Sequence, residues 1–287
     1  MDKSKTERRH VAGSLHLACG VLIGFLSATS VTAAQDTCDE ACQAARKAQD
    51  PLADVRAIMT DNTVSFGTAD EQIGYGFQIQ PVYSIGTDLG FNFIARGIVP
   101  VTGVHNEAAF PKLGPTPIGG TGYTWGLSDI MLQGFFVPEL DNSPIKFGIG
   151  PQVSLRSRTD DVVGGPGWGA GVAGVAFGFA GDLSYGALVG HHWGQDNFNL
   201  TTVQPIAFYN TDLLGGSYFG YNNSITYSWT AKTGNRWQVP VGLTVGKTFA
   251  LDNGYAVDVN LGGYTLAAHP KGGADAQFKF GVSVFFP

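Results

Sequence analysis

Hydrophobic and polar residues alternate along most of the chain after residue 61. In the segment 74–84 the odd positions carry Tyr, Phe, Ile or Pro, whereas Gly, Gln and Ser fill most of the even positions. The segments 146–156 and 277–286 repeat the pattern, with Phe and Val among the residues of the apolar side. Side chains of a β-strand point alternately to its two faces, so each segment predicts a strand with one apolar face and one polar, glycine-rich face.

Twelve segments of this kind can be counted, an even number that suits a closed antiparallel barrel. The predicted strands are 62–67, 73–85, 89–101, 125–138, 144–156, 167–179, 182–194, 199–211, 217–230, 235–249, 253–267 and 273–286. Connections at the end that holds both termini are then short, and the two longest loops, 102–124 and 157–166, fall at the other end, as expected for an outer-membrane barrel. Prolines within strands cannot complete a ladder and predict bulges or bends at Pro81, Pro100, Pro151, Pro205 and Pro240.

The polar face distinguishes a membrane barrel from a soluble β-sandwich, which is the alternative. It carries Gly, Ser, Gln and Asn with single charges, whereas a sandwich exposes charge densely. After the N-terminal segment no run of eighteen apolar residues occurs, and only helices or closed barrels satisfy their backbone in lipid. Tryptophan and tyrosine gather near the strand ends, as in interfacial girdles. The expected fold is all-β: a transmembrane antiparallel β-barrel of about 12 strands with a short N-terminal helical leader.

The first 34 residues have the three parts of a secretory signal. Four basic residues between positions 3 and 9 precede an apolar stretch over 11–31, and small residues follow at Ala33 and Ala34. We expect cleavage after Ala34 or one residue earlier, with an uncleaved anchor helix as the alternative. Export and a barrel together predict the bacterial cell outer membrane, with outer-membrane lipid and the barrel-assembly machinery as partners.

Residues 35–61 form the leader that precedes the barrel of residues 62–287. An alanine-rich segment over 38–49 suits a short helix, and Pro51 can begin a second turn that reaches Ile58. A disordered leader is the alternative. Cys38 and Cys42 remain after cleavage, so one local disulfide or a free pair of thiols is expected in an oxidising compartment.

Charge and motifs argue against nucleic acid, metal or catalysis. Cleavage removes four of 17 basic and two of 23 acidic residues, which leaves 13 and 21 and a formal charge of −8, so no basic surface is expected. The two adjacent histidines, His191 and His192, point to opposite faces, and we expect only His192 to face the lumen. We therefore expect no enzyme, no cofactor and no metal, although an outer-membrane hydrolase stays an alternative.

The polar strand faces give the expected lining of the lumen. If they point inward, we expect the solute path to be lined by Gln78, Gln80, Arg96, Asp129, Gln133, Lys146, Gln152, Arg156, Gln204, Gln238, Asp258, Gln277 and Lys279. Arg96, Lys146 and Arg156 are expected to face Asp129 across or along the lumen, which would make a constriction with a transverse field. Alternatively, the polar groups hydrogen-bond with one another and fill a narrow barrel.

Short motifs are spread over most of the chain: Asp50-Pro-Leu-Ala-Asp, Ile79-Gln-Pro, Gly126-Leu-Ser-Asp-Ile, Thr159-Asp-Asp with Trp168, Gln204-Pro with Tyr209-Asn, Gly234-Asn-Arg-Trp-Gln-Val-Pro-Val-Gly and Phe285-Phe-Pro. With these motifs the chain resembles a bacterial outer-membrane transporter family of the phenol-degradation meta-pathway, whose members are often mislabelled neuromedin U. The family has Asn at the positions of Asp50 and Asp54, and the cysteine pair is not part of its pattern. The resemblance implies a barrel with a transport role and supplies no catalytic residues and no established substrate.

These features together predict a channel for passive passage of small, aromatic or otherwise modestly apolar solutes. The two rivals are an outer-membrane enzyme and a structural or adhesive barrel without transport.

Overall fold

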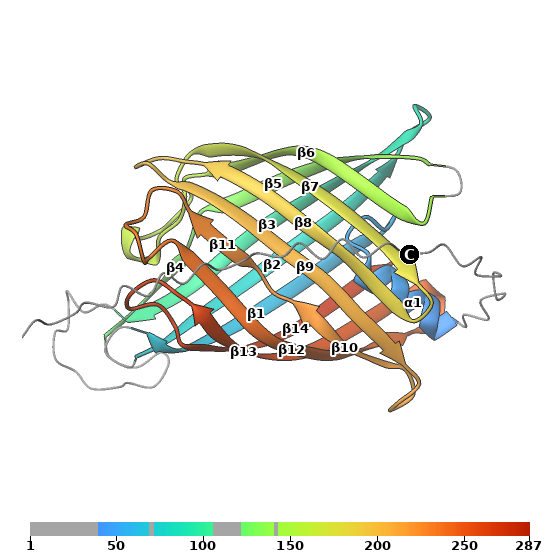
Figure 1. Ribbon diagram of the computed structural model, residues 1–287. Helices are drawn as coiled ribbons and strands as arrows, with labels where there is room; N and C mark the ends of the chain where they lie inside the picture. The colour runs from blue at the N-terminus through green and yellow to red at the C-terminus, as the bar shows by residue number, and fades with distance from the viewer. Residues whose placement is uncertain (1–39, 69–71, 106–121, 141–142) are drawn as a thin grey trace, which may run out of the picture. The chain divides into compact units, whose positions relative to one another are not determined.

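Fourteen strands form one closed antiparallel sheet (Figure 1). The computed structural model describes residues 40–68, 72–105, 122–140 and 143–287. The elements are α1 (Glu40–Gln49), β1 (Arg56–Thr68), β2 (Gln72–Gly86), β3 (Phe91–His105), β4 (Tyr123–Leu127), β5 (Ile130–Pro138), β6 (Ile145–Leu155), η2 (Asp161–Val163), β7 (Gly169–Ala180), β8 (Leu183–Trp193), β9 (Asn199–Thr211), β10 (Ser217–Asn222), β11 (Ile225–Ser228), β12 (Trp237–Ala250), η3 (Asp252–Gly254), β13 (Ala256–Ala268) and β14 (Ala276–Phe286). None of the described helices is long and apolar enough to cross a membrane.

Two of the strands are interrupted in the middle. β4 and β5 both pair with β3, and β10 and β11 both pair with β9 and β12. Each couple therefore acts as one strand, and the pairing of β1 with β14 closes the sheet. The described residues thus form a twelve-stranded antiparallel barrel, which confirms the fold expected from the alternation.

The first strand begins earlier than the sequence pattern suggested. β1 starts at Arg56 and not at residue 62, and the second helical turn expected from Pro51 to Ile58 is replaced by a turn and this strand. Arg56 pairs with Phe286 of β14 and with Tyr83 of β2. The closure of the sheet therefore extends the strand into residues assigned to the leader. Among the five strand prolines, a register shift is recorded at Pro240.

The exterior of the barrel is largely apolar. In β6, Phe147 and Ile149 are 47% and 59% exposed, whereas their neighbours Gly148 and Gln152 are buried. Exposed aromatic side chains gather near the two ends of the strands, with five tryptophans at one end and tyrosines at the other: Trp125, Trp168, Trp193, Trp229 and Trp237, and Tyr83, Tyr209 and Tyr255. The outward parity inferred from the sequence is thus the observed one.

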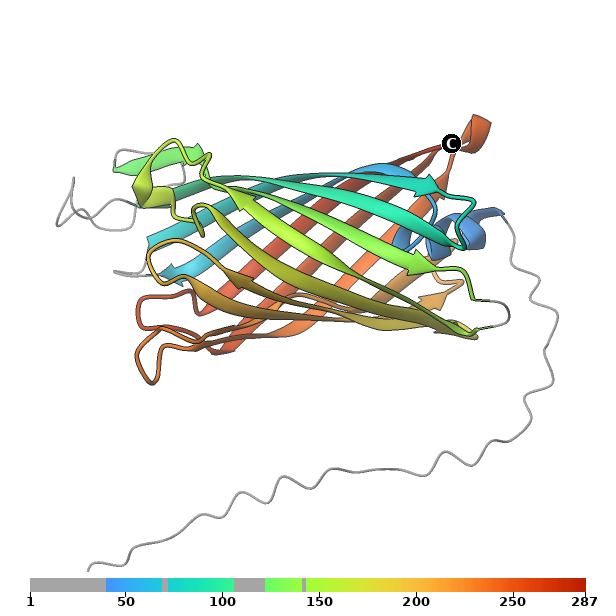
Figure 2. The same cartoon turned by 90° about the horizontal axis from the view of Figure 1, so that it is seen from above.

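The two ends of the barrel differ in their connections (Figures 1 and 2). Helix α1 and the C-terminus lie at one end, the helix end, where the turns 87–90, 181–182, 212–216 and 251–255 are short. The opposite end, the loop end, holds the connection 156–168 between β6 and β7. The signal segment 1–34, its cleavage position, Cys38 and most of the loop 102–124 lie outside the described residues. Cys42 is disulfide-bonded.

Candidate functional site

A polar cavity of about 510 Å³ lies inside the barrel. We call it the amide chamber because glutamine and asparagine side chains supply much of its wall. Ten of the thirteen lumen residues inferred from the sequence line it: Gln78, Gln80, Arg96, Asp129, Gln133, Gln152, Gln204, Gln238, Gln277 and Lys279. His192, which was expected to face the lumen, lines it too, and so do several residues that the sequence analysis did not name, among them Asp61, Pro166, Phe198 and Asn260.

The amide side chains bond to one another along the chamber wall. Gln133 Nε2 donates to Gln152 Oε1 over 2.9 Å, and Gln80 Nε2 donates to Gln78 Oε1 over 2.8 Å. Lys279 Nζ lies 2.8 Å from Asp61 Oδ2. These contacts hold the polar side chains against the wall and neutralise one pair of charges, so the chamber offers hydrogen bonds with little net charge.

A second cavity of about 120 Å³ lies next to the amide chamber, toward the helix end. We call it the apolar chamber because most of its lining is hydrophobic. The lining includes Val82, Ile94, Phe135, Val175, Leu188, Ile206, Phe208 and Phe285. Both chambers are lined by seven residues that form a waist between them: Met59, Arg96, Leu188, Gln204, Asn222, Asn260 and Ser283.

Asp258 belongs to the apolar chamber and not to the amide chamber. Its carboxylate accepts hydrogen bonds from Tyr218 Oη at 2.9 and 3.0 Å and from Thr248 Oγ1 at 2.8 Å. Asn260 Nδ2 adds a contact of 3.2 Å. The carboxylate is buried, and these donors offset part of the cost of removing it from water.

The leader segment, residues 40–54, lies at the helix end of the interior and contacts the barrel wall. Gln49 Nε2 donates to Asn210 Oδ1 over 2.7 Å, and Ser184 Oγ donates to Gln49 Oε1. Asp50 is paired with Lys146 of β6, with 2.7 Å between Nζ and Oδ2. Residues from Ala48 to Pro51 form the floor of the apolar chamber. Whether the leader enters the barrel could not be decided from the sequence, because its contacts lie about a hundred or more residues further along the chain.

Apolar packing fixes the leader segment as well. Leu52 is 3% exposed and packs in one cluster with Ile94, Phe135, Val137 and Leu188. Ala44, Ala48 and Val55 pack against a second cluster around Phe285. Burying a leucine side chain contributes about 1.5–3 kcal/mol. The ion pair of Lys146 and Asp50 contributes less, because removing the buried Asp50 carboxylate from water offsets much of the attraction.

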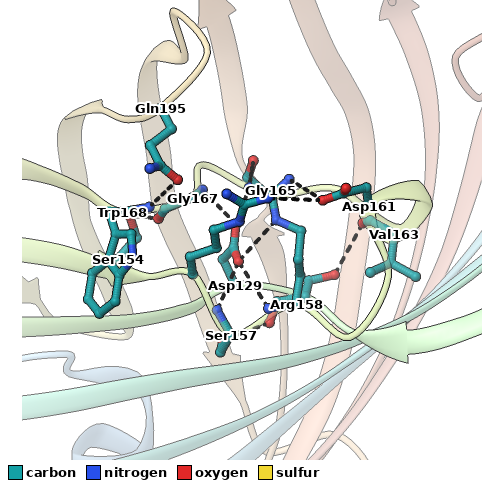
Figure 3. A network of polar contacts seen from close by, with 12 residues as sticks. Asp129, Ser154, Ser157, Arg158, Asp161, Val163, Gly165, Gly167, Trp168 and Gln195 are labelled. Atoms are coloured by element: carbon teal, nitrogen blue, oxygen red, sulfur yellow. Dashed lines mark hydrogen bonds and ion pairs between the residues drawn. The ribbon is translucent and has the colours of Figure 1, made fainter.

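At the loop end, a buried carboxylate holds the connection 156–168 (Figure 3). Asp129 sits in the break between β4 and β5, and its side chain is fully buried. It accepts from the backbone N–H groups of Ser157, Arg158 and Gly167, at 3.1, 3.2 and 2.6 Å. Arg158 Nη2 lies 2.9 Å from Asp129 Oδ2. The carboxylate therefore organises this loop, and Pro166 of the same loop reaches the wall of the amide chamber.

Glycine is required where the loop crosses this carboxylate. Gly165 has φ +144° and Gly167 has φ +69°, and a Cβ at Gly165 would lie 2.3 Å from Asp129 Oδ2. A side chain at Gly165 would therefore displace the carboxylate from its donors.

Three of the expected charge positions differ from the sequence-based hypothesis. Lys146 and Arg156 line neither chamber: Lys146 binds Asp50, and Arg156 lies at the end of β6 with Nη2 3.7 Å from Asp161. Asp129 is paired with Arg158 and not with Arg96. The alternation of residues along a strand predicts which face a side chain is on, but not how far along the barrel axis it lies. Near the strand ends these charged side chains form ion pairs with the leader segment or with the loop 156–168. The prediction that these residues set up a transverse field across the lumen is therefore wrong.

The histidine pair has the expected orientation. His192 is buried and lines the amide chamber, whereas the ring of His191 lies 4.2 Å from that of Trp193. His192 Nε2 is 2.9 Å from Ser154 Oγ, but this hydroxyl donates to the carbonyl of Gly167. Within the described chain, His192 Nδ1 has no hydrogen-bond partner. Ser154 and His192 therefore lack the acid that orients the histidine of a hydrolase triad. The part of the chain that the structure describes contains no group of three or more His, Cys, Asp or Glu side chains that could hold a metal ion.

Sequence comparison finds neither a family model nor a curated protein that matches the chain. Among solved structures, the barrel is similar to an outer membrane channel from Pseudomonas putida F1, with a TM-score of 0.56, 10% identity and coverage of 83% of this chain and 98% of that chain. CdiB from Acinetobacter baumannii gives a TM-score of 0.34 at 11% identity, with coverage of 82% and 60%, and this weaker likeness carries no argument. At such low identity the similarity concerns the fold, which is that of an outer-membrane channel barrel.

Proposed function

We propose that this protein is an outer-membrane channel for passive passage of small solutes. The observation that carries the proposal is a polar cavity of about 510 Å³ inside a closed barrel whose outer wall is apolar. Apolar residues facing outward at all heights suit hydrocarbon, and exposed aromatic residues at both ends suit its interfaces. The secretory signal expected from the sequence and the fold similarity to a channel support the same location.

Solutes would enter at the loop end and meet chemistry that changes along the path. The amide chamber exchanges hydrogen bonds with a solute without binding it through strong charge, and the apolar chamber then favours a modestly apolar body. This order supports small, aromatic or otherwise modestly apolar solutes. The resemblance to the transporter family of the phenol-degradation meta-pathway supports a transport role but supplies no established substrate.

The leader segment is the element that closes this path. It occupies the helix end, which is the periplasmic end if the barrel has the usual orientation, and it contacts the wall through Gln49, Asp50 and Leu52. We propose that passage requires this segment to leave its position. The barrel wall itself does not depend on it, because the strands of the described sheet, apart from the short β4, are hydrogen-bonded to neighbours on both sides.

Liposome swelling tests the channel. Liposomes containing folded protein should swell in an isotonic arabinose solution faster than liposomes containing the same protein unfolded by boiling. A variant whose mature chain begins at Val55, and which therefore lacks the leader segment, should swell faster still. Heat-modifiable migration on a gel shows that both forms are folded. If neither folded form swells faster than the boiled control, the channel function is contradicted.

A further inference from the structure

Arg96 holds an unusual position in the waist. It lies on β3, lines both chambers and donates from Nη2 to Gln80 Oε1. Its Nε is buried and has no hydrogen-bond partner, and no carboxylate of the described chain lies within ion-pair distance of it. Leaving a buried charged donor unsatisfied is costly, and Arg96 lines both chambers, so the waist holds a cation that lacks an acidic partner.

The acidic groups nearest to this region are already engaged. Asp61, whose charge acts on Arg96, forms an ion pair with Lys279. Asp258, the acid of the apolar chamber, accepts from Tyr218, Thr248 and Asn260. The waist therefore has a free cationic donor, whereas the carboxylates around it have their acceptors occupied. Such a site favours an anion over a cation or a neutral donor.

The space beside Arg96 has the size and the lining of a site for an apolar ring. The apolar chamber has a volume of about 120 Å³ and is walled by Ile94, Phe135 and Phe208, among others. An apolar cavity of about 150 Å³ in another protein binds benzene, so a ring-sized body needs little rearrangement here. Arg96 stands at the side of the chamber that faces the amide chamber, through which a solute would arrive.

We propose that the waist is a binding site for a small organic carboxylate that has an apolar, ring-sized body. The carboxylate accepts hydrogen bonds from the Arg96 guanidinium, and the body lies in the apolar chamber above the leader segment. This inference rests on the proposed function, because it names the class of solute that the channel would recognise. It also explains why Arg96 is kept inside the barrel without an acidic partner.

Binding to the full mature chain in detergent tests the proposal with benzoate, acetate and benzyl alcohol as probes, each measured by calorimetry. Benzoate should bind more tightly than acetate, which lacks the body, and than benzyl alcohol, which lacks the charge. Arg96→Gln should weaken benzoate binding by about tenfold or more, because a neutral amide replaces the charged donor of the hydrogen bonds to the carboxylate. Its effect on benzyl alcohol should be small.

Lys247→Gln is the matched control. It removes the same charge from β12, where Lys247 donates to the carbonyl of Leu214 and contacts neither chamber, so benzoate binding should remain that of the unaltered protein. Heat-modifiable migration confirms that both variants are folded. Equal benzoate binding by the unaltered protein and Arg96→Gln would overturn the proposal, as would acetate or benzyl alcohol binding as tightly as benzoate, or no binding of benzoate at all.

The binding measurement is independent of transport. A protein that makes liposomes permeable but does not bind benzoate keeps the channel function and loses this inference. A protein that binds benzoate in an Arg96-dependent way but leaves liposomes impermeable loses the channel function instead.

Discussion

The two halves of the barrel interior differ sharply, although the outer wall is the same around both. Toward the loop end, amide side chains line a cavity of about 510 Å³, whereas toward the helix end hydrophobic side chains surround one of about 120 Å³. The leader segment fills the helix end by burying Leu52, and the loop end is shaped by a carboxylate that binds backbone N–H groups and Arg158. The outward side chains are apolar around both halves, as a membrane requires. The inward side chains differ, because they line a polar cavity toward the loop end and pack against the leader segment toward the helix end.

Removing the carboxylate that organises the loop end should have the largest local effect. Asp129→Asn leaves Arg158 without its buried partner, which costs about 3–5 kcal/mol. Hydrogen exchange of the amides of Ser157 and Gly167 should accelerate by about a hundredfold or more, while amides in β7 keep their protection. Unchanged exchange at these amides would show that backbone contacts hold the loop without Asp129.

Shortening the Leu52 side chain should have the second-largest effect, which is to weaken the docking of the leader segment at the helix end. Leu52→Ala removes buried methyl groups from a packed cluster and should weaken leader docking by about 2–5 kcal/mol. Limited proteolysis should then cut within residues 40–54 while the barrel stays heat-modifiable. If the leader remains resistant, its polar contacts through Gln49 suffice to hold it.

A charge introduced on the outer wall should lower the stability of the inserted barrel, whereas the same charge introduced in the lumen should not. Ile149→Arg places a cation on the apolar exterior of β6, where it should destabilise the inserted barrel by about 2–4 kcal/mol. Folded yield in lipid, read from unheated gels, is the measurement. Gln238→Arg adds the same charge to the amide chamber and should insert normally, so equal losses for both would contradict the assignment of the two faces.

The ion pair at the helix end should matter least. Lys146 is half exposed but the Asp50 carboxylate is buried, so the pair is removed whole, as Lys146→Met with Asp50→Asn, which leaves no buried charge unpaired and should weaken leader docking by less than about 1 kcal/mol. The same proteolysis assay compares it with Leu52→Ala at low and high salt. A loss as large as that of Leu52→Ala would mean that charge, and not burial, closes the helix end.

The sequence predicted the fold well because one property of the barrel is uniform. Every strand turns a side to the same apolar surroundings, so Phe147 and Ile149 repeat at a period of two, and twelve strands can be counted from that repeat alone. The inward face has no such uniformity. In β7, Ala173, Val175 and Phe177 face inward and are buried, so inward and outward positions are both apolar and the period carries no information.

The site was only partly accessible from the sequence because its decisive contacts are distant along the chain. Asp50 meets Lys146 after 96 residues, and Asp129 meets Arg158 after 29. Parity placed Lys146 on the inward side, but only the folded leader determines that it binds Asp50 there. A buried acid such as Asp129 does signal that it needs a cation, and the basic residues of the following loop were its nearest candidates.

Single-channel recording with the leader added back tests the central claim most directly, namely that the interior is a solute path closed by the leader segment. The variant beginning at Val55 should conduct at least about tenfold better than the full mature chain, because its helix end is open. A synthetic peptide of residues 35–54 should block this variant when added on the side of the helix end and should have no effect from the side of the loop end. Equal conductance with and without residues 35–54, and no block from either side, would contradict the account.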